Sequence, residues 1–309
     1  MNKMSQRLRI TLAVTAVLVL VIGAVLYKLA DRYLIEHVEV VLPDDPAASD
    51  EGQSSISNAQ FDDWHYSSDQ SEIAIQKVQT GTGKDAITYF VADVKLKNGA
   101  TLQSAFAKNQ FGRNIIDKTS TIAAAHNAVL AINGDYYGFR SDGVIIRNGV
   151  LYRDEPARTG LALFQNGTMK SYDEQSISSS ELLAQGVTNT FSFGPALLID
   201  GQITSSFEHV EIDTNFGNRS IQNSNPRTGI GIIEPNHYVF VVVDGRANNY
   251  SRGMTLAEFA DLFQQLGCTE AYNLDGGGSS TMYFMGRVVN NPQGRDRERG
   301  VSDIVYVGA

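Results

Sequence analysis

The chain opens with a long apolar run and then alternates between short apolar runs and polar turns. The run at 10–27 contains no charged residue, and a helix of roughly 20 apolar residues spans a bilayer core. Lys3, Arg7 and Arg9 precede the run, which predicts a cytoplasmic N-terminus and an exported remainder. We therefore predict a single-pass anchor in the cell membrane. A cleaved signal peptide is the alternative, and it exports the remainder as well.

Beyond the run, residues 31–42 fit either a continued helix or a strand. Residues 43–60 are rich in Pro, Ser, Asp and Ala and have little apolar surface to bury, which is typical of a flexible stalk. From Ile73 onward the pattern predicts strands, and no second linker or internal repeat follows. The predicted division is a cytoplasmic N-terminus at 1–9, a transmembrane anchor at 10–30, a stalk at 31–63 and one domain at 64–309.

Three apolar runs in this domain end in the same way, with an aspartate beside a glycine. They are AVLAI (128–132) before Asn133-Gly134-Asp135, YVFVVV (238–243) before Asp244-Gly245-Arg246, and AYNL (271–274) before Asp275-Gly276-Gly277-Gly278-Ser279-Ser280. Continuous apolar runs of this length predict strands that are buried on both faces. Glycine beside each carboxylate permits a sharp turn or a close approach to a ligand.

A helix is predicted between the second and third of these runs. Thr255 and Glu258 form a capping box, an apolar stripe follows from Leu256 to Leu266, and Gly267 is placed to end the helix. Strand, helix and strand in this order predict a right-handed parallel crossover. The aspartates that follow the two strands would then leave the same edge of the sheet, where ligand sites of α/β sheets form.

Composition narrows the kinds of partner. The 34 acidic residues against 25 lysines and arginines give a formal charge of −9, which argues against nucleic acid. Cys268 is the only cysteine, so no intrachain disulfide forms. The chain also lacks a P-loop, a dinucleotide fingerprint, a zinc-protease helix and a G-x-S-x-G elbow.

The Asp-Gly segments also have plainer interpretations. Asn133-Gly134 and Asp244-Gly245 are common turn dipeptides. Three consecutive glycines at 276–278 are more informative, because each has a high entropic cost in a folded segment. Exposed amides in such a turn are suited to an anion.

Taken together, several stretches resemble the phosphodiester glycosidase family. They are AINGDYY (131–137), GVIIRNGVLY (143–152), FGPALLIDG (193–201), NPRTGIG (225–231), VVVDGR (241–246), NLDGGGSSTM (273–282) and RGVSDIVYV (299–307). They follow the expected order from about residue 64 to the C-terminus, and NLDGGGSS is specific. The predicted fold class is α+β, a single mixed-sheet catalytic domain behind one N-terminal transmembrane helix; the anchor comes from the apolar run and is a departure from the family.

The resemblance implies hydrolysis of the sugar C1–O bond in a sugar-1-phosphodiester of the N-acetylglucosamine type. A carboxylate stabilises or attacks the oxocarbenium-like centre. The phosphomonoester leaving group has a second pKa of about 6, so it needs little protonation, and neutralisation by arginine matters more. The catalytic candidates are Asp135, Asp244 and Asp275. The substrate-binding candidates are Asn133, Tyr136, Arg227, Thr228, Arg246, Gly276, Gly277, Gly278, Ser279 and Ser280.

Within this hypothesis Arg227 and Arg246 bind the phosphate, the glycine amides and Ser279 assist, and Asn133 binds a sugar hydroxyl. No cofactor is required, although Asp135 and Asp275 are candidate ligands for Ca²⁺ or Mg²⁺. The anchor favours a glycan phosphodiester of the cell envelope or an exopolysaccharide as substrate. Two other functions stay open: a glycopolymer-binding domain without turnover, and a phosphodiesterase that cuts the P–O bond.

Overall fold

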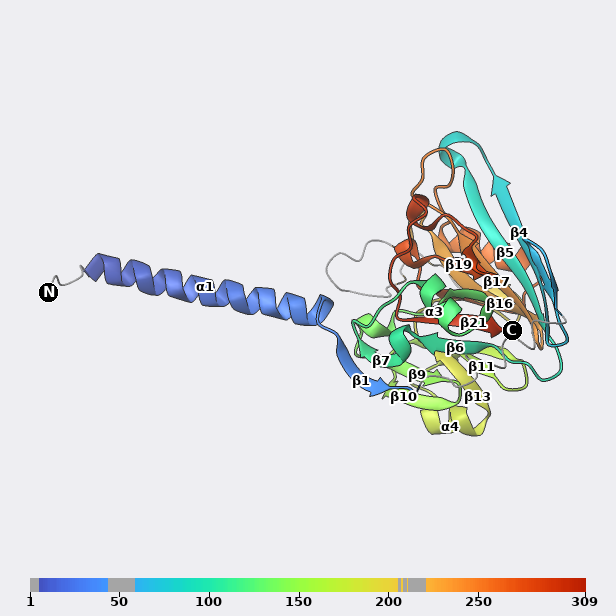
Figure 1. Cartoon of the computed structure of the whole chain (residues 1–309), viewed down its shortest axis with the longest axis horizontal. Coiled ribbons are helices and arrows are strands. Elements are labelled where there is room, and N and C mark those ends of the chain that lie inside the picture. The colour runs from blue at the N-terminus through green and yellow to red at the C-terminus, as the bar shows by residue number, and fades with distance from the viewer. Residues whose placement is uncertain (1–5, 44–58, 205–206, 208–209, 211–220) are drawn as a thin grey trace.

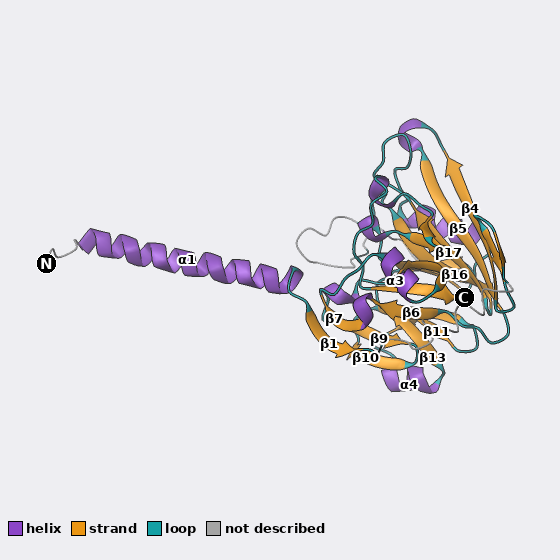
Figure 2. Ribbon diagram, viewed as in Figure 1, coloured by secondary structure: helices purple, strands orange, loops and turns teal. Residues whose placement is uncertain are grey.

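Helix α1 (Gln6–Tyr33) projects from a body made mostly of β-sheets (Figures 1 and 2). The computed structural model describes residues 6–43, 59–204, 207, 210 and 221–309. The apolar part of α1, Ile10–Asp31, is long enough to cross a membrane and none of it is buried in the protein, as for a membrane span or a signal sequence. The predicted α+β class with one N-terminal apolar helix is confirmed.

Strand β1 (His37–Val41) follows α1 and pairs antiparallel with β7 (Gln110–Arg113). The segment after the anchor thus contains both of the elements considered for it, first helix and then strand. Residues 37–41 of the predicted stalk are paired with the domain, and residues 44–58 lie outside the described part of the chain. The division into stalk and domain stays a prediction.

A nine-stranded sheet forms the larger layer of the body, and all its neighbouring strands are antiparallel. Its order is β15-β14-β18-β16-β17-β5-β4-β3-β2. The strands are β2 (Gln60–Phe61), β3 (His65–Ser67), β4 (Ser71–Thr80), β5 (Ile87–Leu96), β14 (Ala196–Ile199), β15 (Gln202–Ile203), β16 (Arg227–Glu234), β17 (His237–Val243) and β18 (Glu270–Leu274).

A five-stranded antiparallel sheet, β20-β19-β8-β21-β6, forms the second layer. Its strands are β6 (Gln103–Phe106), β8 (Ala128–Asn133), β19 (Met282–Phe284), β20 (Arg287–Val288) and β21 (Asp303–Gly308). The remaining strands are β9 (Gly143–Arg147), β10 (Val150–Glu155), β11 (Thr159–Phe164), β12 (Met169–Asp173) and β13 (Val187–Phe191). The short helices are α3 (Thr119–Ala125), α4 (Ser179–Ala184) and α5 (Leu256–Gln265), with 3-10 turns η3 (Gly83–Asp85), η4 (Ala107–Asn109), η5 (Tyr137–Phe139), η7 (Gly277–Ser279) and η8 (Pro292–Gly294).

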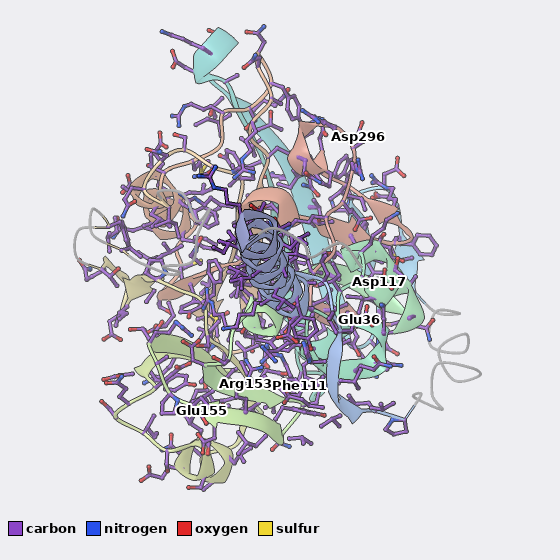
Figure 3. All side chains as sticks on the ribbon, turned by 90° about the vertical axis from the view of Figure 1, so that its left-hand side faces the viewer. Glu36, Phe111, Asp117, Arg153, Glu155 and Asp296 are labelled. Atoms are coloured by element: carbon purple, nitrogen blue, oxygen red, sulfur yellow. The ribbon has the colours of Figure 1, made fainter. Side chains whose placement is uncertain are left out.

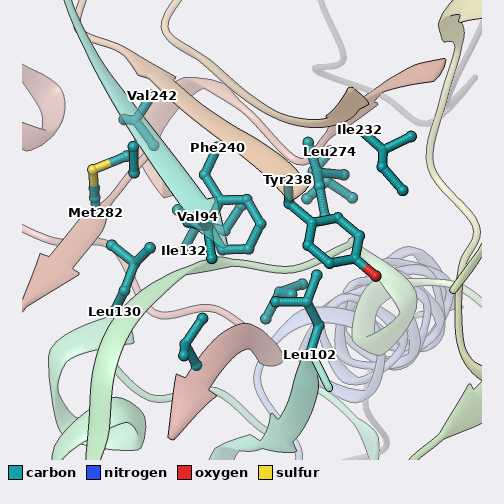
Figure 4. Packing of buried hydrophobic residues seen from close by; sticks show 14 of the residues in the cluster. Val94, Leu102, Leu130, Ile132, Ile232, Tyr238, Phe240, Val242, Leu274 and Met282 are labelled. Atoms are coloured by element: carbon teal, nitrogen blue, oxygen red, sulfur yellow. The ribbon is translucent and has the colours of Figure 1, made fainter. Parts of the chain in front are cut away.

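The main hydrophobic core lies between these two sheets (Figure 4). Phe240 and Leu274 of the larger sheet pack in one cluster with Leu130, Ile132 and Met282 of the smaller one. The other face of β17 contributes to a second cluster under α5, and the other face of β8 to a third under α3. The strands that precede the Asp-Gly turns are therefore buried on both faces, as their apolar runs predicted.

Two glycines in β16 let α5 pack closely on the sheet. A Cβ atom at Gly229 would lie 2.8 Å from the ring of Phe259, and one at Gly231 would lie 2.7 Å from Sγ of Cys268. The helix begins with the predicted capping box of Thr255 and Glu258. Small residues on the strand thus make room for the aromatic side chains of the helix.

The two strands on either side of α5 run in the same direction, as predicted. They are not neighbours, because β16 lies between them and pairs antiparallel with both. The predicted parallel crossover therefore spans one strand. The ends of β17 and β18 and the beginning of β16 share one edge of the sheet.

We expect Gly231→Ala to destabilise the fold, because its Cβ would collide with Cys268 and with the ring of Phe263. Overpacking of a core typically costs about 1–3 kcal/mol. Thermal unfolding of the purified full chain measures the loss. Gly308→Ala is the control, since a Cβ atom there meets nothing within 4 Å. Equal melting temperatures for the two variants would contradict the packing account.

Candidate active site

The candidate site lies where β16 begins and β17 and β18 end. Arg227, the first residue of β16, pairs with Val243, and Thr228 pairs with Leu274. Asp244 and Asp275 follow those two partners directly along the chain. The antiparallel register therefore brings the NPR segment (225–227) between two of the predicted Asp-Gly turns.

Close backbone approach explains the glycines around Pro226. The amide of Gly277 donates to the carbonyl of Pro226 at 2.9 Å. A Cβ atom at Gly276 would lie 2.8 Å from that carbonyl oxygen, and one at Gly245 would lie 2.9 Å from the Pro226 nitrogen. Gly277 has a φ of +63°, which side chains other than glycine rarely adopt. The glycine loop 276–278 is thus shaped by contact with the NPR segment.

Two arginine side chains flank the glycine loop. A Cβ atom at Gly277 would lie 3.2 Å from Nη2 of Arg246, and one at Gly278 would lie 3.3 Å from Cδ of Arg299. Both arginines are exposed to solvent, whereas Gly278 is buried. Because the loop has no side chains, the side chains of Arg246 and Arg299 lie in close contact with its backbone.

Asp275 is held at one of its carboxylate oxygens. Its Oδ2 accepts hydrogen bonds from Ser279 Oγ at 2.6 Å and from Arg299 Nη2 at 3.0 Å. Arg299 also donates from Nε to Ser279 Oγ at 3.1 Å. Within the described part of the chain no hydrogen bond reaches Oδ1. The side chain is 13% exposed, so this oxygen belongs to a carboxylate that is partly open to solvent.

Asn133 binds the backbone at the start of this loop from the protein interior. Its Nδ2 donates to the carbonyl of Asp275 at 2.6 Å, and its Oδ1 accepts from Thr228 Oγ1 at 2.8 Å and from the amide of Thr281 at 3.2 Å. The side chain is fully buried. In this structure Asn133 positions the backbone of the site, and both its polar atoms are engaged by the protein.

Asp244 is buried in a network of its own. Its carboxylate accepts from Asn290 Nδ2 and Tyr250 Oη, each at 2.8 Å, and from the amide of Asn291 at 3.0 Å. Burial raises the pKa of Asp244, while the bonds from Asn290, Asn291 and Tyr250 act in the opposite direction. Asn290 also donates to the carbonyl of Ser280, which links this network to the end of the glycine loop.

Asp135 belongs to a buried cluster with Arg147 and Asp303. Arg147 donates to Oδ2 of Asp303 at 2.6 Å and to Oδ2 of Asp135 at 3.3 Å. Asp135 also accepts from the amides of Tyr137 and Ser192. One guanidinium between two ionised carboxylates would leave a net negative charge in a buried space, which disfavours ionisation of the second carboxylate. Burial accordingly raises the pKa of Asp303 to about 7, and Arg147 offsets only part of the effect.

Arg227 is buried and donates to backbone carbonyls, with Nε reaching Met254 at 3.0 Å and Nη2 reaching Asn223 at 2.9 Å. Burial, and then repulsion by Arg246, lowers the pKa of Arg227 to about 10. Arg246 donates from Nη2 to Asn225 Oδ1 at 3.1 Å. Two cations that disfavour each other form a setting in which an added anion is stabilised.

The remaining predicted residues have different surroundings. Thr228 and Ser280 are buried. Tyr136 is half-buried and stacks on Phe139 at 4.8 Å between ring centroids. Asp135 and Asp275 lie in separate networks, and the described residues contain no group of three or more His, Cys, Asp or Glu side chains that would hold a metal ion. The divalent cation therefore stays a prediction without a converged set of ligands.

The site combines a glycine loop, the carboxylate of Asp275 and the exposed side chains of Arg246 and Arg299 at one edge of the larger sheet. A family profile described as phosphodiester glycosidase (NAGPA) matches residues 126–308, more than half of the chain. The chain belongs to the phosphodiester glycosidase family.

Individual proteins share sequence or fold with this chain. The SPbeta prophage-derived uncharacterized protein YomE of Bacillus subtilis (strain 168) is 33% identical over 190 residues, which cover 59% of this chain and 28% of that relative. The zebrafish N-acetylglucosamine-1-phosphodiester alpha-N-acetylglucosaminidase catalytic domain, auto-inhibited by its pro-peptide, superposes with a TM-score of 0.60 at 19% identity over 90% of this chain and 97% of that chain. A hypothetical protein from Synechocystis gives a TM-score of 0.56 at 16% identity over 76% and 62% of the two chains. The solved structures establish a shared fold.

Five residues of these networks are absent from the predicted site: Arg147, Tyr250, Asn290, Arg299 and Asp303. The sequence could have indicated Arg147 and Asp303 as buried charged residues, because each adjoins an apolar run that predicts a buried strand. A charged residue in such a strand needs a partner of opposite charge. Arg299 lies in a polar loop, and nothing in its local sequence indicates Asp275 as its partner.

The Asp303 cluster makes stability depend on pH. The folded-state pKa of Asp303, about 7, lies above the ordinary value of 3.8, so folding retains a proton between these values. The stabilisation is complete below the unfolded pKa and is lost as pH rises through about 7. We expect Asp303→Asn, which stays neutral, to gain melting temperature relative to wild type between about pH 5 and about pH 8.

Thermal unfolding at several pH values measures that gap. Asp142→Asn removes an exposed carboxylate that pairs with Arg158 and serves as the control. A gap between Asp303→Asn and wild type that is constant with pH would mean that Asp303 is ionised throughout this range.

Proposed function

We propose that the protein is an extracytoplasmic hydrolase that cleaves the sugar C1–O bond of a sugar-1-phosphodiester of the N-acetylglucosamine type. The substrate is a glycopolymer of the cell envelope or an exopolysaccharide, and the protein is held in the cell membrane by α1 with its N-terminus in the cytoplasm. The proposal draws on family membership and on the zebrafish enzyme whose name states this activity.

The observation that carries the proposal is the arrangement of Asp275 on the glycine loop. Ser279 and Arg299 donate hydrogen bonds to Oδ2, and Oδ1 accepts none from the described residues. A carboxylate oriented in this way is suited to the positive charge that develops at C1 when the bond to phosphate breaks. We assign Asp275 to that role. Water then supplies the hydroxyl group at C1, and the phosphomonoester leaves with the electron pair of the broken bond.

Arginine supplies the charge that the leaving group requires. Arg246 and Arg299 border the loop, and the buried Arg227 is close enough to Arg246 for the two charges to interact. Guanidinium groups bind phosphate oxygens through paired N–H donors and stay charged at any physiological pH. In this arrangement the phosphate lies over Gly276–Gly278, with Arg246 as its main contact and Arg227 as the fixed charge behind it.

Asp135 and Asp244 have supporting roles in this proposal. Asp135 is saturated by Arg147 and two backbone amides, so it maintains the turn after β8. Asp244 lies close to the loop through Asn290 and is the second carboxylate available to it. If Asp244 acts as a base, its raised pKa places that function closer to neutral pH than an ordinary aspartate.

We expect the full chain in detergent to release free N-acetylglucosamine from UDP-GlcNAc or from a synthetic GlcNAc-1-phosphodiester. Asp275→Ala should abolish this release, because the charge at C1 loses its carboxylate. Chromatography of the products makes the measurement. Release of sugar-1-phosphate would instead identify a phosphodiesterase that cuts the P–O bond. Absence of turnover across several sugar-1-phosphodiesters, together with retained binding, would identify a glycopolymer-binding domain.

Arg246→Ala should lower kcat/KM on the same diester by roughly 10- to 100-fold, which is the effect of removing a hydrogen bond to a charged group. Arg246→Lys should lie between wild type and alanine, because it keeps the charge and loses the paired donors. Arg295→Ala removes an exposed arginine of a nearby loop and is the control. If Arg246→Ala and Arg295→Ala retained equal activity, the phosphate would lie elsewhere.

A further inference from the structure

The membrane helix and the domain are joined by a short and well-bonded junction. Only residues 34–36 separate α1 from β1, and three residues span at most about 11 Å. Nδ2 of Asn114 donates to the carbonyls of Asp31 at 3.1 Å and Ile35 at 2.8 Å. Lys108 forms an ion pair with Glu36, and β1 continues the junction as a strand on β7. The end of α1 is therefore fixed against the domain.

The same part of the domain supports the candidate site. Ile116 lies two residues beyond Asn114, and a Cβ atom at Gly300 would lie 2.8 Å from Cδ1 of Ile116. Asp117 and Val301 exchange backbone hydrogen bonds at 3.0 and 2.8 Å. The amide of Ser120 donates to the carboxylate of Glu298 at 2.9 Å.

The segment 298–301 therefore rests on residues 116–120, and Arg299 in that segment contacts Asp275. Two residues of chain span at most about 7 Å. A few side chains thus connect the exit of the membrane helix with the carboxylate of the site.

The views of the whole chain agree with these contacts. The red-orange turns η7 and η8 lie on the side of the domain that faces α1 (Figure 1). Figure 3 looks along α1 onto this side and shows Glu36 and Asp117 beside the helix, with Asp296 farther from it. By the position of η7 in Figure 1, the glycine loop and the anchor lie on one face of the domain. Leu34 is 77% exposed and Ile35 is 40% exposed at this junction, which suits the boundary between headgroups and acyl chains.

From this shared face we infer that the envelope glycan is itself carried by the same membrane: the sugar C1 of the glycan is joined through the phosphodiester to a lipid. The inference rests on the proposed function. A lipid-linked diester has its phosphate in the headgroup region, which extends roughly 5–8 Å on each side of the apolar core. A site that faces the bilayer across a short junction meets such a phosphate directly. Confinement of both partners to one surface also raises their effective concentration.

The test uses the full chain reconstituted into vesicles and three substrates at equal bulk concentration. The first is a GlcNAc-1-phosphodiester of a long-chain alcohol in the same bilayer, the second is the same lipid in separate vesicles, and the third is the water-soluble methyl diester. We expect cleavage in the same bilayer to be at least about 10-fold faster than in separate vesicles. Equal rates in the two vesicle arms, with the methyl diester cleaved, would overturn the inference and leave the proposed function intact. Cleavage of none of the three would overturn both.

A variant that loosens the junction tests the role of its geometry. It combines Asn114→Ala with ten Gly-Ser residues inserted between Leu34 and Ile35. We expect its advantage in the same bilayer to fall several-fold while turnover of the methyl diester is unchanged. Asn98→Ala is the matched control, because Asn98 also has a positive φ and donates from Nδ2 to a backbone carbonyl. An undiminished advantage in the loosened variant would contradict the claim that the junction presents the site to the bilayer.

Discussion

One buried carboxamide, that of Asn133, joins the two sheets at the edge where the candidate site lies. It ends β8 of the smaller sheet and bonds to Thr228 in β16, to the carbonyl of Asp275 after β18 and to the amide of Thr281 before β19. Asparagine suits this position because one short planar group offers both donors and an acceptor. An aspartate would lack the donor and a leucine both functions. Either would leave buried polar groups unsatisfied, at about 1–3 kcal/mol each.

The geometry of the glycine loop follows from that anchor. Asn133 fixes the carbonyl of Asp275, so the loop leaves the sheet at a defined point. Two residues later the amide of Gly277 donates to the carbonyl of Pro226. A side chain at 276 would collide with the carbonyl of Pro226, and side chains at 277 and 278 would crowd the side chains of Arg246 and Arg299. Glycine at these positions therefore lets the arginine side chains lie directly against the backbone of the loop. The chemistry of the site thus depends on an amide that has no contact with solvent.

Much of this fold follows from the apolar pattern. Runs at 128–132, 238–243 and 271–274 became strands buried on both faces, and the capping box of Thr255 and Glu258 begins α5. The order of the strands could not be predicted from this pattern. The pattern of apolar residues along a strand shows which of its faces are buried, but it does not show which strands pair with each other. The position of β16 between β17 and β18 is of this kind.

The site was predictable to a similar degree. Asp135 and Asp275 share the same local pattern of strand, aspartate and glycine, yet one is saturated and the other is partly open. The difference arises from Arg147, Ser192 and Asp303 around Asp135 and from Arg299 beside Asp275, partners that local sequence does not associate with either aspartate. Local sequence thus predicts where carboxylates leave the sheet, and distant contacts decide which of them faces a ligand.

Charge illustrates the same division between local and global properties. The formal charge of −9 repels a phosphodiester at long range, but salt screens charges beyond about 8 Å under physiological conditions. Around the glycine loop lie the side chains of Arg246 and Arg299, the latter paired with Asp275, and Arg246 is close enough to Arg227 to lower its pKa. An anionic polymer therefore gains little from the protein surface as a whole. Under the proposed function one phosphate lies over the loop, so recognition would depend on a single phosphodiester rather than on the length of the polymer.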